Sequence, residues 1–127
     1  MMNQTKTSPQ ADKLDQIFKL QGELDAEICR RWNMENISVE EWVQKEALAI
    51  MAELGELIAE VNYKWWKQPK PIDWKAVTEE TIDVFHFVIS LCLKLGITAD
   101  ELHKAYEAKN LVNWKRQEID EEHQNGG

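Results

Sequence analysis

A chain of 127 residues is the size of one domain, and its composition is 43% hydrophobic and 30% charged, with five Gly and three Pro. So many helix formers and so few turn residues favour long helices and argue against an all-β fold. The net charge of -8 opposes sequence-independent binding to DNA or RNA, because such binding depends on surplus Lys and Arg that neutralise phosphates.

The cysteines and the hydropathy exclude further classes. Cys29 and Cys92 belong to no CxxC pair or Cys/His cluster, so neither a zinc site nor a disulfide framework is indicated. No run of about 18 apolar residues is long enough to span a bilayer, and residues 1–10 lack the apolar segment of a signal peptide. We therefore expect a cytoplasmic protein without a membrane partner.

In chain order, hydrophobic periodicity predicts four helices, over residues 11–33, 38–65, 74–95 and 99–117. Residues 1–10 are polar and aperiodic, and residues 120–127 form an acidic, Gly-ended tail within the C-terminal segment 118–127. We therefore place one all-α domain at residues 11–117 and expect flexible termini on either side.

Local signals mark several helix boundaries. Ser38 is followed three residues later by Glu41, and Thr98 by Glu101, which is the capping-box spacing of a helix start. The two prolines of the KQPKP segment separate the second helix from the third, because proline removes a backbone donor and disfavours helix just before it. Gly96 is expected to end the third helix.

The third predicted helix is apolar on nearly its whole circumference between residues 84 and 93. This pattern predicts a central, buried helix in a four- to five-helix bundle. A helix that is apolar all round in so small a domain also indicates that a second subunit covers part of it. We expect a homo-oligomer, either a dimer or a tetramer.

Four carboxylates stand in two pairs at helical spacing, Glu53 with Glu56 and Glu80 with Asp83. Residues three apart share a helix face, so each pair can direct two carboxylates at one point. A lone ExxE pair is more often a solvated helix face. Asp83 favours a functional site, because an ionised carboxylate in a helix that is otherwise apolar on every side needs a counter-charge.

The same helix does not supply that counter-charge. Its nearest basic residues, Lys75 and Lys94, are eight and eleven residues from Asp83, more than two helical turns away. Carboxylate oxygens without His or Cys suit Mg²⁺ or Mn²⁺, and Mg²⁺ commonly shares its coordination with substrate phosphates. The acidic pairs therefore predict a metal site for phosphate chemistry.

The last helix offers donors for phosphate. Lys109, Asn113 and Arg116 are spaced i, i+4, i+7 and share one face, and an Arg fork with a Lys ammonium suits phosphate oxygens. The alternative is an ordinary basic helix end favoured by the helix dipole. Trp65 and Trp66, flanked by lysines, can stack on a base, although such a cluster is also typical of a dimer interface.

The order of these motifs resembles the all-α NTP pyrophosphohydrolase superfamily, which includes the MazG-like enzymes. The motifs are ELGEL from residue 53, KWWK, ETIDVFHF from residue 80 and KNLVNWKRQ from residue 109. Within the superfamily the chain is most similar to the dimeric dUTPase branch, from about Gln16 to Gln117.

The resemblance implies a function for each motif. Glu53, Glu56, Glu80 and Asp83 would bind two or three Mg²⁺ ions that activate a water to attack the phosphate chain and release a nucleoside monophosphate. The three donors of the last helix, Lys109, Asn113 and Arg116, would hold the phosphates of the same or a neighbouring subunit's substrate.

The resemblance also bears on the base. Gln21 matches a glutamine that the dimeric dUTPases use near uracil, whereas Asp25 stands where that branch has Asn, and Trp65 and Trp66 complete the expected base-binding set. The expected reaction is dUTP to dUMP and pyrophosphate. Because the compact chain is nearer in size to MazG-like enzymes, the alternative substrates are dCTP or a broader or modified set of nucleotides. From a different class, the alternative is a non-catalytic helical interaction module.

Overall fold

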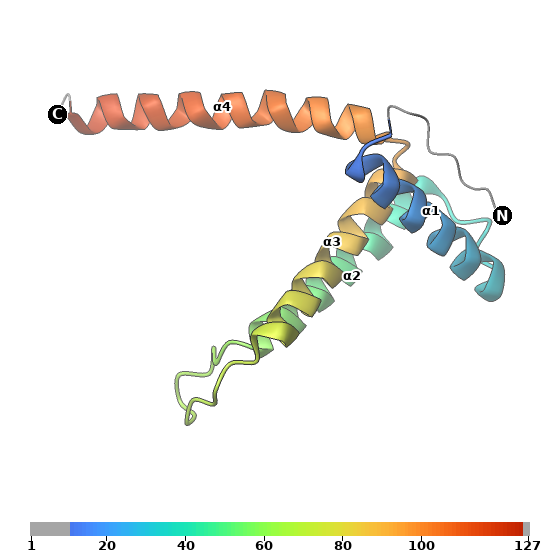
Figure 1. The fold of residues 1–127 in the computed structure, drawn as a ribbon, viewed down its shortest axis with the longest axis horizontal. Coiled ribbons are helices and arrows are strands. Elements are labelled where there is room, and N and C mark those ends of the chain that lie inside the picture. The colour runs from blue at the N-terminus through green and yellow to red at the C-terminus, as the bar shows by residue number, and fades with distance from the viewer. Residues whose placement is uncertain (1–10, 126–127) are drawn as a thin grey trace.

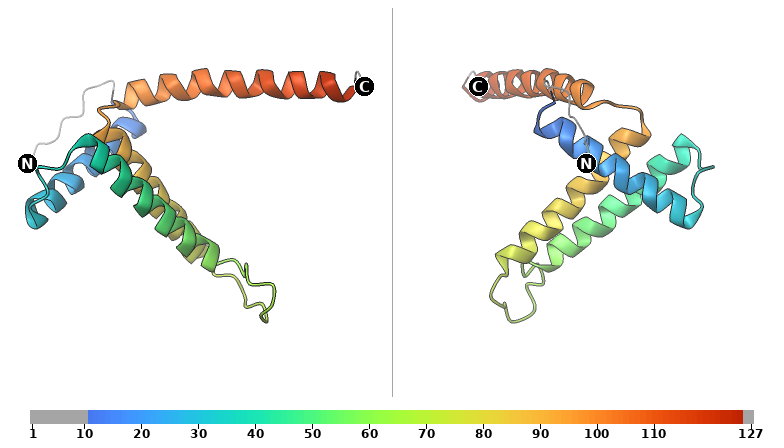
Figure 2. Two further views of the ribbon diagram at one scale, coloured as in Figure 1. Left: turned by 180° about the vertical axis from the view of Figure 1, so that it is seen from behind. Right: turned by 45° about the vertical axis from the view of Figure 1, so that its right-hand side comes forward.

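The computed structural model describes residues 11–125, which form four α-helices and no strand. The helices are α1 (Lys13–Trp32), α2 (Val39–Ala59), α3 (Trp74–Lys94) and α4 (Ala99–Asn125). The predicted all-α class is confirmed. In Figure 1, α2 and α3 lie side by side as an antiparallel hairpin, α1 lies near the end of the hairpin far from its loop, and α4 extends away from all three. Two further views of the same ribbon agree with this arrangement (Figure 2).

Side-chain caps fix where the helices begin. Ser38 Oγ accepts a hydrogen bond of 3.1 Å from the backbone N–H of Glu41 at the start of α2. At the start of α4, Thr98 and Glu101 form a reciprocal pair of bonds of 3.0 and 3.1 Å, so the predicted capping box is present. Gly96, which follows the C-cap residue Leu95 of α3, has a φ of 75°, a left-handed conformation that suits glycine and ends the helix as predicted.

Two helix ends differ from the sequence prediction. α2 ends at Ala59 rather than at residue 65, because Asn62 adopts a left-handed conformation and its side chain bonds twice to the backbone of Lys70, at 2.8 and 3.0 Å. This clamp closes the loop between residues 62 and 70, which contains the first of the two prolines. α4 continues to Asn125 rather than ending at residue 117. Residues 1–10, 126 and 127 lie outside the described part, so the domain limits and flexible ends stay predictions.

The hydrophobic core is small and lies where α1, the end of α3 and the start of α4 meet. It consists of Phe18, Ile89, Cys92 and Ala99, with partly buried leucines and Ile97 packed around them. α1 and α3 therefore hold each other at one end of the hairpin, and the acidic pairs lie nearer its other end.

The prediction that α3 is buried on every side is wrong for the single chain. Only Ile89, Ser90 and Cys92 of this helix are buried, whereas Ile82, Phe85 and Val88 are 48%, 41% and 38% exposed. The reason is that α4 turns away from α3 by 110°, and every residue from His103 to His123 is exposed. The expected oligomer stays a prediction.

Within residues 11–125, no single helix is long and apolar enough to cross a membrane. The bent pair of Trp74–Lys94 and Ala99–His123 passes that test when taken together, by length and composition only.

Candidate active site

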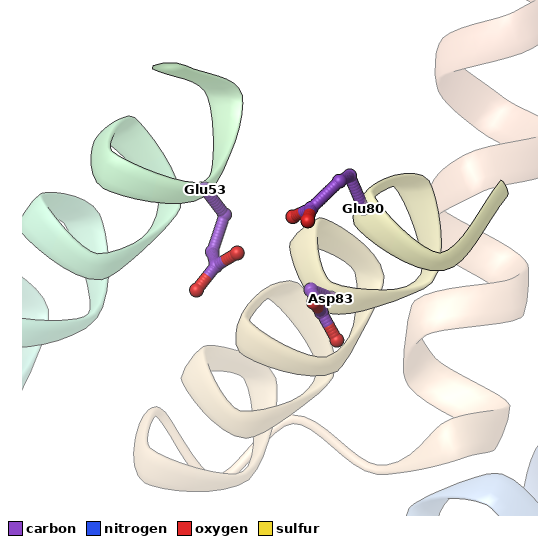
Figure 3. Close-up of side chains that lie close together, drawn as sticks. All are labelled: Glu53, Glu80 and Asp83. Carbon is purple, nitrogen blue, oxygen red and sulfur yellow. The ribbon is translucent and has the colours of Figure 1, made fainter. Parts of the chain in front are cut away.

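The α2–α3 hairpin brings the two acidic motifs together. Glu53 on α2 and Glu80 and Asp83 on α3 each offer a carboxylate oxygen, and these oxygens all lie within 4.8 Å of one another. In Figure 3, Glu53 and Glu80 reach from α2 and α3 into the space between the two helices, and Asp83 lies on the following turn of α3. The geometry follows from antiparallel packing, which sets an early turn of α3 against a late turn of α2.

Glu56 belongs electrostatically to the same cluster. Burial is the largest cause that raises the pKa of Glu53 above its usual value, and the hydrogen bond and negative charge of Glu56 raise this pKa further. The same causes, with the charges of Asp83 and Glu53, raise the pKa of Glu80 to about 6. The four carboxylates predicted from the sequence therefore act on one another as a group.

The cluster lacks a positive partner. One oxygen each of Glu53 and Glu80, Oε2 in both, is buried without a hydrogen-bond partner. None of the salt bridges among the described residues involves these carboxylates. Unpartnered oxygens that converge from two helices fit a hard divalent cation such as Mg²⁺, which prefers oxygen ligands.

The prediction that Asp83 lies in a buried environment is wrong for the single chain. Asp83 is exposed in the single chain, and the oxygens that lack partners belong to Glu53 and Glu80. A counter-charge is needed because several carboxylates converge at one point and two of them, Glu53 and Glu80, are partly buried. Burial of Asp83 is not the reason.

A cleft of about 340 Å³ adjoins the acidic cluster. Glu53 and Asp83 line it together with apolar side chains and a set of polar groups from all three of α1, α2 and α3. The apolar walls come from Leu24, Ile28, Met34, Trp42 and Phe87. A half-open cleft of this volume can accept a nucleoside whose phosphates point toward the carboxylates.

A polar network crosses the cleft between α1 and α3. Asp25 accepts hydrogen bonds from Gln21 Nε2 at 2.9 Å and from Ser90 Oγ at 2.8 Å. Lys94 Nζ lies 3.5 Å from Asp25 Oδ2 and 3.1 Å from Ser90 Oγ. The same ammonium lies 4.1 Å from the centre of the Trp42 ring, a cation–π contact. Gln21 and Asp25 both line the cleft, and their contacts with a base stay predictions.

Two other predicted groups lie apart from the cleft in the single chain. Trp65 and Trp66, in the loop after α2, are 87% and 58% exposed and pack edge to face against each other with ring centres 4.6 Å apart. The phosphate-binding set on α4, Lys109, Asn113 and Arg116, is exposed on the helix that points away from the hairpin (Figure 1). The roles of these five residues stay predictions.

The cleft also contains residues that were not singled out from the sequence as site residues, among them Ser90, Lys94, Trp42 and Glu46. Ser90 and Lys94 are spaced i, i+4 on α3, and Trp42 and Glu46 have the same spacing on α2. A serine and a lysine in the apolar second half of α3 were a usable signal. Trp42 and Glu46 gave none, because an amphipathic helix normally carries such residues on its surface.

The helical hairpin with an ExxE pair facing an ExxD pair defines the class of protein. The chain is a member of the all-α NTP pyrophosphohydrolase superfamily, as its motifs predicted. Residues 13–95 match the family model described as dUTPase, which covers more than half of the chain, and the chain therefore belongs to the dUTPase family. The matched residues include α1, α2 and α3, but not α4.

Several curated proteins are similar in sequence. A dCTP pyrophosphatase of Enterobacteria phage T4 is 33% identical over 75 residues, which are 59% of this chain and 44% of that protein. YpjD, an uncharacterized protein of Bacillus subtilis, is 35% identical over 81 residues, which are 56% of this chain and 73% of that protein. The chain thus spans less than half the length of the phage enzyme. No solved structure matches the chain significantly.

Proposed function

We propose that the protein is a Mg²⁺-dependent pyrophosphohydrolase of pyrimidine deoxynucleoside triphosphates, which releases the monophosphate and pyrophosphate. Mn²⁺ is expected to substitute for Mg²⁺. The observation that carries the proposal is the cluster of carboxylate oxygens from Glu53, Glu80 and Asp83, all within 4.8 Å, beside a cleft of about 340 Å³. Membership of the dUTPase family supports the same chemistry.

The four carboxylates are proposed to hold the metal between α2 and α3. The buried oxygens of Glu53 and Glu80 that lack partners would gain a cation, and Glu56, whose charge raises the pKa of both, would complete the ligand set. Bound Mg²⁺ supplies Lewis-acid stabilisation of charge on the phosphates and favours deprotonation of a water nucleophile.

The cleft orients the nucleotide. The phosphates would lie at the end lined by Glu53 and Asp83, and the base would lie between apolar walls toward Gln21. A metal held by these carboxylates would stabilise the negative charge that develops on the phosphates when the bridge between the α and β phosphorus atoms is broken.

Two substrates are supported by different observations. The dUTPase family and the presence of Gln21 in the cleft support dUTP, the expectation from the sequence. The printed function of the phage T4 relative supports dCTP, as does Asp25, which replaces the Asn of the dimeric dUTPase branch. The proposed reaction is the same for both.

A second copy of the chain is proposed to complete the site. Lys109, Asn113 and Arg116 share an exposed face of α4, and this helix extends away from its own hairpin, so they suit the phosphates of a substrate bound to a neighbouring subunit. The exposed apolar side chains of α3 and α4 support burial in a homodimer or tetramer. No polymeric nucleic acid or membrane partner is proposed, and the cytoplasmic location stays a prediction.

The test is a product analysis with the full chain. The common deoxyribo- and ribonucleoside triphosphates and dUTP are incubated with the protein in Mg²⁺, in Mn²⁺ and in EDTA. Monophosphate and pyrophosphate are expected as first products with either metal, and none in EDTA. Nucleoside diphosphate and phosphate as first products would contradict the proposal. No hydrolysis, together with no effect of Mg²⁺ on the melting temperature, would favour the non-catalytic interaction module.

A further inference from the structure

Glu46 is the one residue of α2 that is buried, with 6% of its surface exposed. It lines the same cleft as Gln21 and Trp42, and its Oε2 has no hydrogen-bond partner among the described residues. A buried carboxylate oxygen without a donor is unfavourable, so a residue of this kind in a binding cleft indicates a donor that arrives with the ligand.

The neighbouring charged groups do not provide that donor. Lys94 Nζ is engaged by Asp25 and Ser90 and lies over the Trp42 ring, and Glu46 takes part in none of the salt bridges within 4.0 Å in the described chain. Asp25 differs from Glu46, because Oδ1 and Oδ2 of Asp25 both already accept hydrogen bonds. Glu46 is therefore the carboxylate in the base region that is free to accept a hydrogen bond from a ligand.

An ionised carboxylate only accepts hydrogen bonds, so it distinguishes bases by their donors. Cytosine presents an amino group at position 4, and acidic side chains characteristically accept from it. Uracil presents a carbonyl oxygen at that position, and its N3–H is flanked by two carbonyl oxygens that repel a carboxylate. The cleft thus suits a 4-aminopyrimidine better than uracil.

We propose that Glu46 accepts a hydrogen bond from the 4-amino group of cytosine and makes dCTP the preferred substrate over dUTP. This inference rests on the proposed function, whose two candidate substrates it separates. Trp42, one helical turn before Glu46, would stack on the same base. The ammonium of Lys94 lies over the Trp42 ring and holds it in place.

The first experiment uses the unaltered protein. kcat/KM is measured for dCTP, dUTP, dATP and the deoxynucleoside triphosphate of 2-pyrimidinone, which lacks any group at position 4. We expect dCTP to exceed each of the others by at least about tenfold, the discrimination typical of one good base contact. Equal rates for dCTP and the 2-pyrimidinone analogue, or preference for dUTP or dATP, would overturn the inference.

The second experiment replaces the carboxylate by an amide of the same shape. In Glu46→Gln the new amide can donate to uracil O4, so the kcat/KM ratio of dCTP to dUTP should fall by at least about tenfold. Glu40→Gln, an exposed substitution on the same helix, should leave the ratio unchanged. An unchanged ratio in a folded Glu46→Gln protein would overturn the inference but leave the pyrophosphohydrolase assignment intact.

Binding of the products keeps the two proposals separable. Calorimetry of dCMP and dUMP with the unaltered protein reports base preference without hydrolysis. Tighter binding of dCMP supports the role of Glu46 even if no triphosphate is cleaved, in which case only the proposed function fails. Equal binding, or tighter binding of dUMP, counts against Glu46 whatever the catalytic result.

Discussion

Lys94 at the end of α3 lies 3.5 Å from Asp25 of α1, and the two side chains are each only 15% exposed. This salt bridge joins residues 69 positions apart and connects the helix that carries the acidic ExxD motif to the helix that carries Gln21. It therefore holds the end of the cleft that Gln21 lines in a fixed position relative to the carboxylate cluster.

Lys94→Met is expected to destabilise the protein by about 2 to 3 kcal/mol, because Asp25 would keep a largely buried charge without its cation. The free energy of unfolding from urea titration measures this. Lys104→Met is the matched control, since Lys104 pairs with Asp100 at side-chain exposures of 73% and 71%, and should change stability by about 0.5 kcal/mol or less. The double variant Asp25→Asn/Lys94→Met should regain part of the loss. Equal effects of Lys94→Met and Lys104→Met would contradict the structural role of the salt bridge.

Glu80→Gln is expected to have opposite effects on stability and activity. Without metal it removes a charge from a cluster in which carboxylates repel one another, so the melting temperature in EDTA should rise. In Mg²⁺ the variant should lose the metal-induced stabilisation, and kcat/KM should fall by more than about 100-fold, because a metal contributes several kcal/mol to such reactions. Glu79→Gln, its exposed neighbour, should show neither effect. A Glu80→Gln protein that keeps full activity would disprove the ligand assignment.

The pH dependence of stability should follow the raised pKa of Glu80. A carboxyl group whose pKa is raised by folding stabilises the native state when protonated, so this contribution is fully present below pH 4.5 and is lost as the pH rises through about 6. Because Mg²⁺ binds the deprotonated carboxylates, the rise in melting temperature caused by Mg²⁺ should be small near pH 5 and larger above about pH 7. Thermal unfolding in EDTA and in Mg²⁺ over this pH range tests whether the melting temperature and its rise with Mg²⁺ change with pH in the expected directions. A Mg²⁺ effect that is greatest at acid pH would contradict it.

Mixing two inactive variants tests whether α4 acts on a neighbouring subunit. In a dimer with sites shared between chains, an equal mixture of the Glu80→Gln protein and the Arg116→Ala protein should regain about one quarter of the unaltered activity. The reason is that random exchange of subunits leaves about one site in four with neither substitution. Arg116→Ala alone should cost roughly 2 to 4 kcal/mol of transition-state stabilisation. Light scattering should give a mass of at least twice 14.9 kDa. No recovery after re-assortment would place α4 and the carboxylates of each site in one chain.

The sequence by itself determined the features that depend on local chemistry. The period of the apolar residues identified four helices, and Thr98, Glu101 and Gly96 marked helix ends by interactions within a few residues. The acidic pairs were also recognisable, because residues three apart on a helix share a face whatever surrounds it. These patterns need no knowledge of how the helices pack.

Only the tertiary structure decided the features that depend on packing over long distances. The clamp between Asn62 and Lys70 ended α2 early, α4 turned away from α3, and Asp83 stayed exposed beside the cleft. The contact of Ser90 with Asp25 joins positions 65 residues apart, so no local pattern contained it. Glu46 illustrates the physical reason: its burial comes from side chains of other helices, and a helical period records which residues share a face but not what covers that face.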